Sequence, residues 1–234
     1  MRENALLQSL PEEELTKLRP YLRTVELKAG QPLLEIGEPI EAVWFPHDCV
    51  TSTVVDTREG TTIEVGLMGM EGLVGVSLLL GGSVSNSTVI AQVSGTATRM
   101  SAQDFKAQIV EPRGEPFFRL LQYVDAFMAM VAQTAACNSL HGIDERLARW
   151  ILMTRDRVGR DDLALTHEFL AYMLGVRRAS VSIAALGLAQ MGFIKYSRGH
   201  LMILDRSGLE SAACACYSVV RHITEQLYKS REAA

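Results

Sequence analysis

The sequence predicts an α+β protein, with an N-terminal antiparallel β-roll of the jelly-roll type, one long helix, and a C-terminal helical domain that carries a small β-hairpin. Three observations predict this fold class. Ten of the 18 glycines lie between residues 30 and 95, among short apolar runs. Apolar side chains then recur at three- and four-residue spacing over residues 117–138. Two short helical patterns joined by a glycine follow, and a hairpin pattern comes after them.

The roll is predicted from four short runs of β-branched and aromatic residues, at 43–45, 52–55, 62–65 and 88–91. Turns that contain glycine separate these runs, and many short strands with regular glycine punctuation are typical of an antiparallel barrel or roll. Glu59 and Gly60 stand between two of the runs and predict a hairpin turn. Before the roll, residues 4–22 predict a short helix with Pro11 at its start.

A long helix is predicted over residues 117–138, after a shorter helix over residues 101–109 that Ser101 caps. The long helix is more apolar than one contact with its own domain requires, so we expect it to pair with a second copy of the chain. Burial against its own domain is the alternative. Arg119 and Asp125 interrupt the apolar run, which argues against a membrane span. The apolar positions are Phe117, Leu120, Leu121, Val124, Phe127, Met128, Val131 and Ala135.

The composition indicates a globular protein, since 48% of the residues are hydrophobic and 21% are charged. The N-terminus shows no basic-then-apolar leader, so we expect a soluble, cytoplasmic protein. Residues 1–140 carry 10 Lys and Arg against 17 Asp and Glu, whereas residues 141–234 carry 13 against 10. The positive balance of the second part permits a nucleic-acid-binding site there.

The four cysteines are Cys49, Cys137, Cys214 and Cys216, and they form no C-x-x-C pair. Together with the missing leader, this argues against a disulfide framework. Cys214 and Cys216 lie in an apolar stretch, where buried structural cysteines are more common than metal ligands. We therefore expect no metal site.

The C-terminal pattern is a helix over residues 143–158, a break at 159–162, and then two short helices joined by a glycine. Thr166 can cap the first short helix, and Gly175 supplies a sharp turn in which a side chain would strain the backbone. Val176 fills the angle between the two helices. The positions expected to face inward are Phe169, Leu170, Met173, Leu174, Val181, Ala184, Ala185 and Leu188. This is the arrangement of a helix-turn-helix.

The start of the second short helix carries the side chains best suited to DNA, namely Arg177, Arg178, Ser180 and Ser182. Arginine donates two hydrogen bonds to guanine O6 and N7, and serine hydroxyls suit phosphate. A hairpin with its turn at Arg198-Gly199 follows, and such a wing touches the DNA backbone. The predicted DNA-binding set is completed by Thr166, His167, Lys195, Ser197, Arg198 and His200. Taken alone, the arginine pair could be a solvated face; the whole pattern predicts a winged helix-turn-helix. Residues 207–229 predict a final helix capped by Ser207.

The stretch 165–205, with residues 147–157 before it, resembles the C-terminal domain of the Crp/Fnr family of bacterial transcription regulators. The order of roll, long helix and winged helix is similar to that family over nearly the whole chain. The resemblance implies a cyclic-nucleotide-binding-like sensor domain at 1–116, a dimerisation helix at 117–140 and a DNA-binding domain at 141–234. It also implies a homodimer on palindromic double-stranded DNA, with RNA polymerase as a candidate partner.

Members of this family that bind cyclic nucleotides hold the ribose with a Glu and the phosphate with an Arg. Val76 stands at the Glu position here and Asn86 at the Arg position, so we expect no cyclic AMP control at the usual site. We therefore expect that the effector is an unknown small molecule or that there is no effector, and we predict no cofactor. The candidate effector pocket consists of Gly75, Val76, Asn86, Ser87, Thr88 and, on the long helix, Thr134. An iron–sulfur sensor would need an N-terminal cysteine cluster, where only Cys49 stands, and a haem sensor would rest on His47 alone.

Two other classes of function share parts of this pattern. A cupin-like enzyme would share the roll, but it needs several histidines in the barrel, and residues 1–140 contain only His47. The usual catalytic motifs are also missing, so we expect no enzyme. The second class is a protein-interaction module whose helix-turn-helix does not read DNA. An effector-independent regulator is a further alternative.

Overall fold

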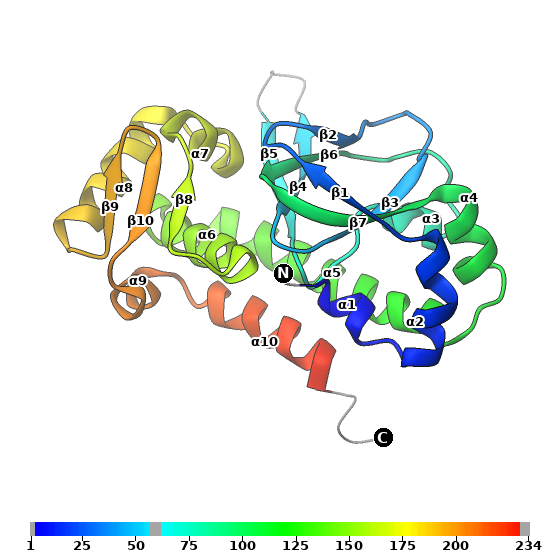
Figure 1. The fold of residues 1–234 in the computed structure, drawn as a ribbon. Helices are drawn as coiled ribbons and strands as arrows, with labels where there is room; N and C mark the ends of the chain where they lie inside the picture. Colours follow the sequence, from blue (N-terminus) through cyan, green and yellow to red (C-terminus); the bar gives the residue numbers. More distant parts are fainter. Residues whose placement is uncertain (1–2, 57–61, 230–234) are drawn as a thin grey trace.

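The computed structural model describes residues 3–56 and 62–229. It contains a β-roll, a long helix that runs beneath the roll, and a C-terminal domain beside it (Figure 1). The α+β fold class predicted from the sequence is confirmed. The predicted turn at Glu59-Gly60 lies outside the described residues.

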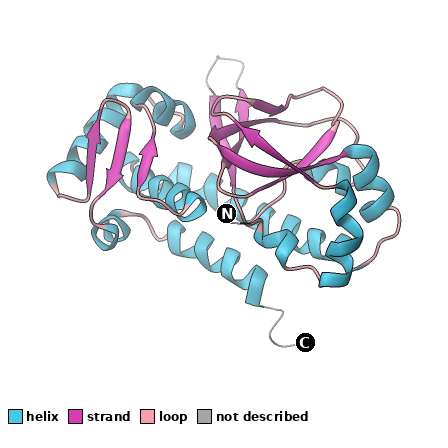
Figure 2. Cartoon of the chain, viewed as in Figure 1, coloured by secondary structure: helices cyan, strands magenta, loops and turns pink. Residues whose placement is uncertain are grey.

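The roll consists of two antiparallel sheets, ordered β1-β7-β3 and β2-β6-β4-β5. Figure 2 shows the strands of the roll in magenta. Three of the four runs predicted from the sequence lie inside strands β3, β4 and β6, and the run at 62–65 begins strand β5. The register shifts between Thr53 and Val54 in the β4–β5 pair, which marks a bulge. The strands are β1 Arg23–Leu27, β2 Pro32–Leu34, β3 Ala42–Pro46, β4 Val50–Asp56, β5 Thr62–Met68, β6 Thr88–Val93 and β7 Gly95–Ser101.

The N-terminal segment forms more than the single helix predicted over residues 4–22. It contains α1 (Ala5–Gln8), α2 (Glu12–Leu18) and a 3-10 turn (Arg19–Tyr21). Pro11 starts the second helix as predicted. The first helix exists because the buried Asn4 accepts a hydrogen bond from the Leu7 N–H and donates to the Pro46 and Gly72 carbonyls. Asn4 thus fixes where α1 begins. Pro11 separates α1 from α2, because the residue before a proline is disfavoured in the helical conformation.

Short helices close the roll on the side of the long helix. They are α3 (Val76–Leu79), α4 (Ala102–Phe105) and a π-turn (Lys106–Val110). Ser101 caps α4 as predicted, because its hydroxyl accepts a hydrogen bond from the Asp104 N–H at 3.0 Å.

The long helix α5 spans Glu115–Leu140 and buries one face against the roll. On length and composition alone it could cross a membrane, but it packs here as a helix of a globular fold, beside α10 and strand β5. Three large apolar side chains stay exposed, Phe118, Met128 and Leu140.

The C-terminal domain begins with α6 (Ile143–Val158), whose bounds match the prediction. It continues with β8 (Asp162–Ala164), α7 (His167–Leu174), α8 (Arg178–Gln190), β9 (Ile194–Ser197) and β10 (His200–Ile203). The predicted hairpin of β9 and β10 is therefore present, and β8 adds a third strand on the β10 side.

The final helix predicted over residues 207–229 is wrong as one element. It is divided into α9 (Arg206–Ala212) and α10 (Cys216–Lys229). The cap of α9 is Asp205, not Ser207, since the Asp205 carboxylate accepts the Gly208 N–H at 3.0 Å. Ala213 is extended (φ −79°, ψ 149°), which ends α9 and lets α10 turn to lie along α5.

Buried polar side chains join the roll to the C-terminal domain. Trp150 of α6 donates to Glu64 of β5 at 3.1 Å, and Gln92 of β6 donates to Thr154 of α6 at 3.3 Å. Ser52 of β4 donates to the same Glu64 at 2.6 Å. Because buried polar groups are costly unless paired, these contacts fix the face of the roll that α6 can cover.

Candidate DNA-binding site

Helices α7 and α8 cross at 109° on either side of a tight turn. The Thr166 hydroxyl caps α7 by accepting the Phe169 N–H at 3.1 Å, as the sequence predicts. Gly175 ends α7 in the left-handed region, at φ 62° and ψ 40°. A Cβ atom at Gly175 would lie 2.8 Å from Cδ1 of Ile63 in β5, so both the conformation and the close approach require glycine.

The predicted inward faces of the two helices are buried with one exception. Phe169 is half-buried, with its ring edge-on to Trp150 at 6.4 Å, and Ala171 is buried instead. The remaining positions form one apolar core with α6: Leu170, Met173, Leu174, Val181, Ala184, Ala185 and Leu188. This core holds α8 rigidly, with its other face outward.

The N-terminus of α8 presents positive charge to solvent. Arg177 is the N-cap residue and Arg178 the first helical residue, and both side chains are exposed. Arg178 lies 3.8 Å from Glu168, but that pair is exposed and therefore weak. Ser180 is half-buried in the same first turn. Charge, hydroxyl and free backbone N–H groups thus meet at one helix end, which suits an anionic partner.

Two of the predicted DNA-binding residues, His167 and Ser182, contact each other inside the domain. The Ser182 hydroxyl donates to the Arg178 carbonyl at 3.1 Å and lies 2.9 Å from Nδ1 of His167. The His167 ring stacks on Tyr196 of β9 at 4.1 Å. Burial and the charge of Arg178 lower the pKa of His167, which favours the neutral ring. His167 and Ser182 therefore join α7, α8 and the hairpin.

The hairpin turn has the geometry of a wing tip. Arg198 and Gly199 both have positive φ, 48° and 82°, as a two-residue turn of type I′ requires. Lys195, Ser197, Arg198 and His200 are exposed around it. The Tyr196 hydroxyl donates to the Leu165 carbonyl at 2.6 Å and ties the wing to the start of α7.

The exposed face of α8 also carries apolar residues that the sequence analysis did not select. Ala179, Ile183 and Leu186 point away from the core, and Ile183 is 71% exposed. The signal was present in the sequence, because these positions lie between the predicted inward ones. Apolar side chains on a reading helix suit the thymine methyl group.

The residues predicted for an effector pocket lie at the start of α3, in the segment that leads into β6, and on α5. Gly75 (φ 99°) precedes α3, Val76 begins it, and Asn86 is exposed. The Ser87 N–H donates to Ser85, and Thr88 begins β6. The Thr134 hydroxyl accepts a long hydrogen bond (3.5 Å) from Arg149 of α6, so its described partner lies in the C-terminal domain.

Comparisons with known families match both parts of the chain. The cyclic nucleotide-binding domain family matches residues 24–111, and the Crp-like helix-turn-helix domain family matches residues 145–212. No match was found among curated proteins.

Solved structures of similar fold cover most of the chain. A CRP-family transcriptional regulator from Thermus thermophilus has a TM-score of 0.67 at 19% identity, over 81% of this chain and 96% of that one. A second regulator of the CRP/FNR family from the same organism has a TM-score of 0.65 at 22% identity, over 82% and 98%. A putative regulator of the crp/fnr family from Eubacterium rectale has a TM-score of 0.60 at 20% identity, over 88% and 96%. At this identity the likeness concerns the fold.

The family and these neighbours are transcription regulators and not enzymes. The sequence pattern, the geometry of the helix-turn-helix and the two matched domains agree. The chain belongs to the Crp/Fnr family of transcription regulators, with a cyclic nucleotide-binding-like domain followed by a Crp-like helix-turn-helix.

Proposed function

We propose that the chain acts as a homodimer that reads palindromic operator DNA through α8. The observation that carries this proposal is the exposed N-terminus of α8, where Arg177 and Arg178 stand free of any strong ion pair among the described residues. A guanine contacted by one of these guanidinium groups would receive two hydrogen bonds. The wing residues Lys195 and Arg198 would contact phosphates, as would Ser180.

The proposed roles of the three parts follow their order in the chain. Residues 1–116 form the sensor-like domain, residues 117–140 the dimerisation helix, and residues 141–234 the DNA-binding domain. The dimer is supported by the outward face of α5, which exposes Phe118, Met128 and Leu140 together with several alanines. A second α5 would cover these side chains and set the spacing of two reading helices. RNA polymerase is the natural partner of a regulator bound in this way.

Cyclic AMP is not the proposed signal at the usual site. Val76 and Asn86 replace the carboxylate and the guanidinium that the family's cyclic-nucleotide binders use, and Asn86 is exposed. Without a buried cation, the cyclic phosphate would lose the charge-assisted hydrogen bond that anchors it. The regulator would respond to another small molecule or act without one. Isothermal titration calorimetry with cyclic AMP tests this, and micromolar affinity would contradict it.

The DNA-binding proposal is tested by selecting duplexes from a random library with the full chain and measuring affinity by fluorescence anisotropy. We expect the selected sites to be palindromic. Arg178→Ala should weaken binding to the selected site by about 1–3 kcal/mol, or roughly 5- to 150-fold, and relax the preference at one base position. The control is Arg23→Ala, an exposed arginine of β1, which should bind like the unmodified chain. Unchanged affinity for Arg178→Ala, or no enriched sequence, would favour the protein-interaction alternative.

A further inference from the structure

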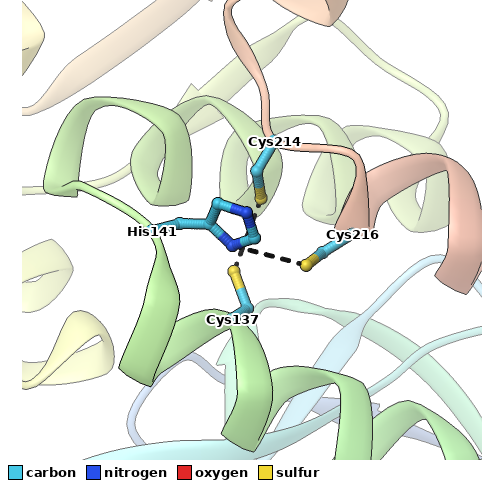
Figure 3. Close-up of side chains that lie close together, drawn as sticks. All are labelled: Cys137, His141, Cys214 and Cys216. Atoms are coloured by element: carbon cyan, nitrogen blue, oxygen red, sulfur yellow. Dashed lines mark hydrogen bonds between the residues drawn. The ribbon is translucent and has the colours of Figure 1, made fainter.

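Four side chains with metal-binding atoms meet where α5 ends and where α9 passes into α10. Cys137 lies in the last turn of α5, and His141 follows that helix as its C-cap. Cys214 lies in the extended link after α9, and Cys216 begins α10. Figure 3 shows the imidazole ring and the three sulfur atoms pointing toward one another from these two segments, which are more than 70 residues apart in the chain.

The spacing of the four atoms fits a single tetrahedral ion. All four ligand atoms lie within 4.8 Å of one another. The sulfurs of Cys137 and Cys214 are 3.4 Å apart, and the Cys216 sulfur is 3.6 Å from Nδ1 of His141. Bonds of about 2.3 Å to sulfur and about 2.0 Å to nitrogen place tetrahedral sulfurs about 3.8 Å apart, and sulfur about 3.5 Å from nitrogen. An iron–sulfur cluster, whose irons each take a different ligand, would need the ligands spread more widely.

The burial of the cluster argues for a built site. The three cysteines are buried and the histidine half-buried, so the ion would be closed off from bulk water. The Gln133 side-chain amide donates to the Cys216 sulfur at 3.0 Å, a contact that suits a thiolate better than a thiol. Three cysteines and one histidine are one of the standard ligand sets of structural zinc, and four protein ligands leave no open position for catalysis.

Two buried arginines beside the cluster supply an independent argument. Arg146 and Arg149 are only 8% and 3% exposed, and the Nε atom of each has no hydrogen-bond partner among the described residues. The charge of Arg146 acts on the thiols of Cys137 and Cys214, and that of Arg149 on Cys137. Glu64 also acts on Arg149, but its carboxylate is held by Ser52 and Trp150.

A buried cation without a counter-charge is unfavourable. A divalent ion bound by three thiolates and a neutral imidazole has a net charge of −1. It would supply that counter-charge to Arg146 and add to the charge of Glu64 that acts on Arg149.

We infer that Cys137, His141, Cys214 and Cys216 bind a structural Zn²⁺ ion that fastens the α9–α10 link to the end of α5. This goes against the expectation of no metal site, which rested on the apolar stretch around Cys214 and Cys216. The ion would hold α10 along α5 and fix the junction of α5 with α6, where the DNA-binding domain begins. The zinc assignment does not depend on whether the chain binds DNA, since none of the four residues belongs to α7, α8 or the wing.

The first test is the metal content of the full chain, purified without chelator and measured by inductively coupled plasma mass spectrometry. We expect about one zinc ion per chain. Cys214→Ser and His141→Ala should each lose the ion. The matched control is Cys49→Ser, a buried cysteine of the roll whose thiol donates to the Thr96 carbonyl; it should keep the zinc. Iron with a cluster absorption spectrum, or a chain free of metal, would overturn the assignment.

The second test does not depend on the folding of variants. Zinc is removed from the unmodified chain with a chelator under reducing conditions, and Co²⁺ is added. We expect one equivalent of Co²⁺ to give the intense visible bands of a tetrahedral thiolate site, and Zn²⁺ to abolish them. We also expect the chelated chain to melt at a lower temperature and to recover on adding Zn²⁺. No cobalt spectrum, or a Cys137–Cys214 disulfide in the chain as purified, would show that the four residues are not a zinc site.

Discussion

Arg157 of α6 donates a hydrogen bond from Nε to the carboxylate of Glu71, at 2.7 Å, and both side chains are almost fully buried. Nη1 of the same arginine donates to the Met153 carbonyl at 2.9 Å. Gly69, two residues before Glu71, has no side chain because a Cβ there would lie 2.6 Å from the arginine stem. The loop after β5 is thus shaped around the side chain of Arg157, which belongs to the C-terminal domain.

Glu71→Gln should destabilise the chain strongly, because it leaves the Arg157 charge buried without a counter-charge. Removing one partner of a buried ion pair costs about 3–5 kcal/mol. Urea unfolding followed by circular dichroism measures the loss. The control is Glu12→Gln, which breaks the exposed pair with Arg19 and should cost less than about 1 kcal/mol. Equal losses for the two variants would mean that the buried pair does not join the domains.

The stability of the chain should fall as pH rises through neutrality because of Glu64. Burial raises the pKa of Glu64 to about 7, although hydrogen bonds from Ser52 and Trp150 and the charge of Arg149 oppose the shift. The folded state therefore holds a proton that the unfolded chain releases near pH 4.5. The stabilisation is complete below about pH 4.5 and is lost as pH rises through about 7, by on the order of 3 kcal/mol at most.

This dependence is measured as the difference between the unmodified chain and Glu64→Gln in denaturant unfolding from pH 5 to pH 8. The difference isolates Glu64, because other groups titrate in this range in both proteins. The amide keeps the shape and an acceptor, so the variant should gain stability relative to the unmodified chain as pH rises. A constant difference across the range would contradict the prediction.

Gly175→Ala should lower stability by about 1–2 kcal/mol through backbone strain alone, since the residue is left-handed at φ 62°. The added methyl group would also meet Ile63. The double variant Ile63→Ala/Gly175→Ala, compared with Ile63→Ala alone, separates the two effects. If the contact matters, the alanine at 175 should be less harmful in the double variant. Thermal unfolding measures the loss of stability caused by the alanine at position 175 in both backgrounds. Identical losses would assign the whole effect to backbone strain.

Met128→Lys should weaken the proposed homodimer, because Met128 lies on the exposed apolar face of α5. A charge on each chain would then be placed in an apolar interface. Sedimentation velocity over a range of concentrations measures the dissociation constant. Ile36→Lys is the control, since Ile36 is equally exposed but lies on the roll. If the unmodified chain and both variants all sediment as monomers, α5 is not a dimerisation helix.

Lys195→Ala should reduce the salt dependence of DNA binding. Lys195 is an exposed wing residue, and we propose that it contacts a phosphate. Each phosphate contact contributes about 0.9 to the slope of log K against log salt, so the slope should fall by about 1 per chain. Anisotropy titrations at several salt concentrations test this. A slope equal to that of the unmodified chain would remove the wing from the interface.

The elements that the sequence predicted well are those with strong local signals. Thr166, Gly175 and the apolar spacing around them placed α7 and α8 within a residue or two, because caps and left-handed glycines act locally. The division of the last segment into α9 and α10 was missed. Asp205 outcompetes Ser207 as the cap, and nothing in the local pattern indicates the extended Ala213.

The candidate sites show the same limit. The exposed face of α8 was predictable, because one helix carries it. The cluster of Cys137, His141, Cys214 and Cys216 was not, because α5 and α10 are brought together only by packing. Cys214 and Cys216 alone look like core residues. Likewise, the roles of His167 and Ser182 as mutual partners depend on how α7 crosses α8.

If α8 reads DNA as proposed, the close approach of Gly175 to Ile63 makes the roll part of the energetics of DNA recognition. The turn that aims the reading helix rests on strand β5, and a cleft lined by Thr62, Glu168 and Arg177 opens beside it. A displacement of β5 therefore changes the free energy of one orientation of the reading helix relative to another. By thermodynamic reciprocity, an operator that favours one orientation favours the matching state of the roll to the same extent.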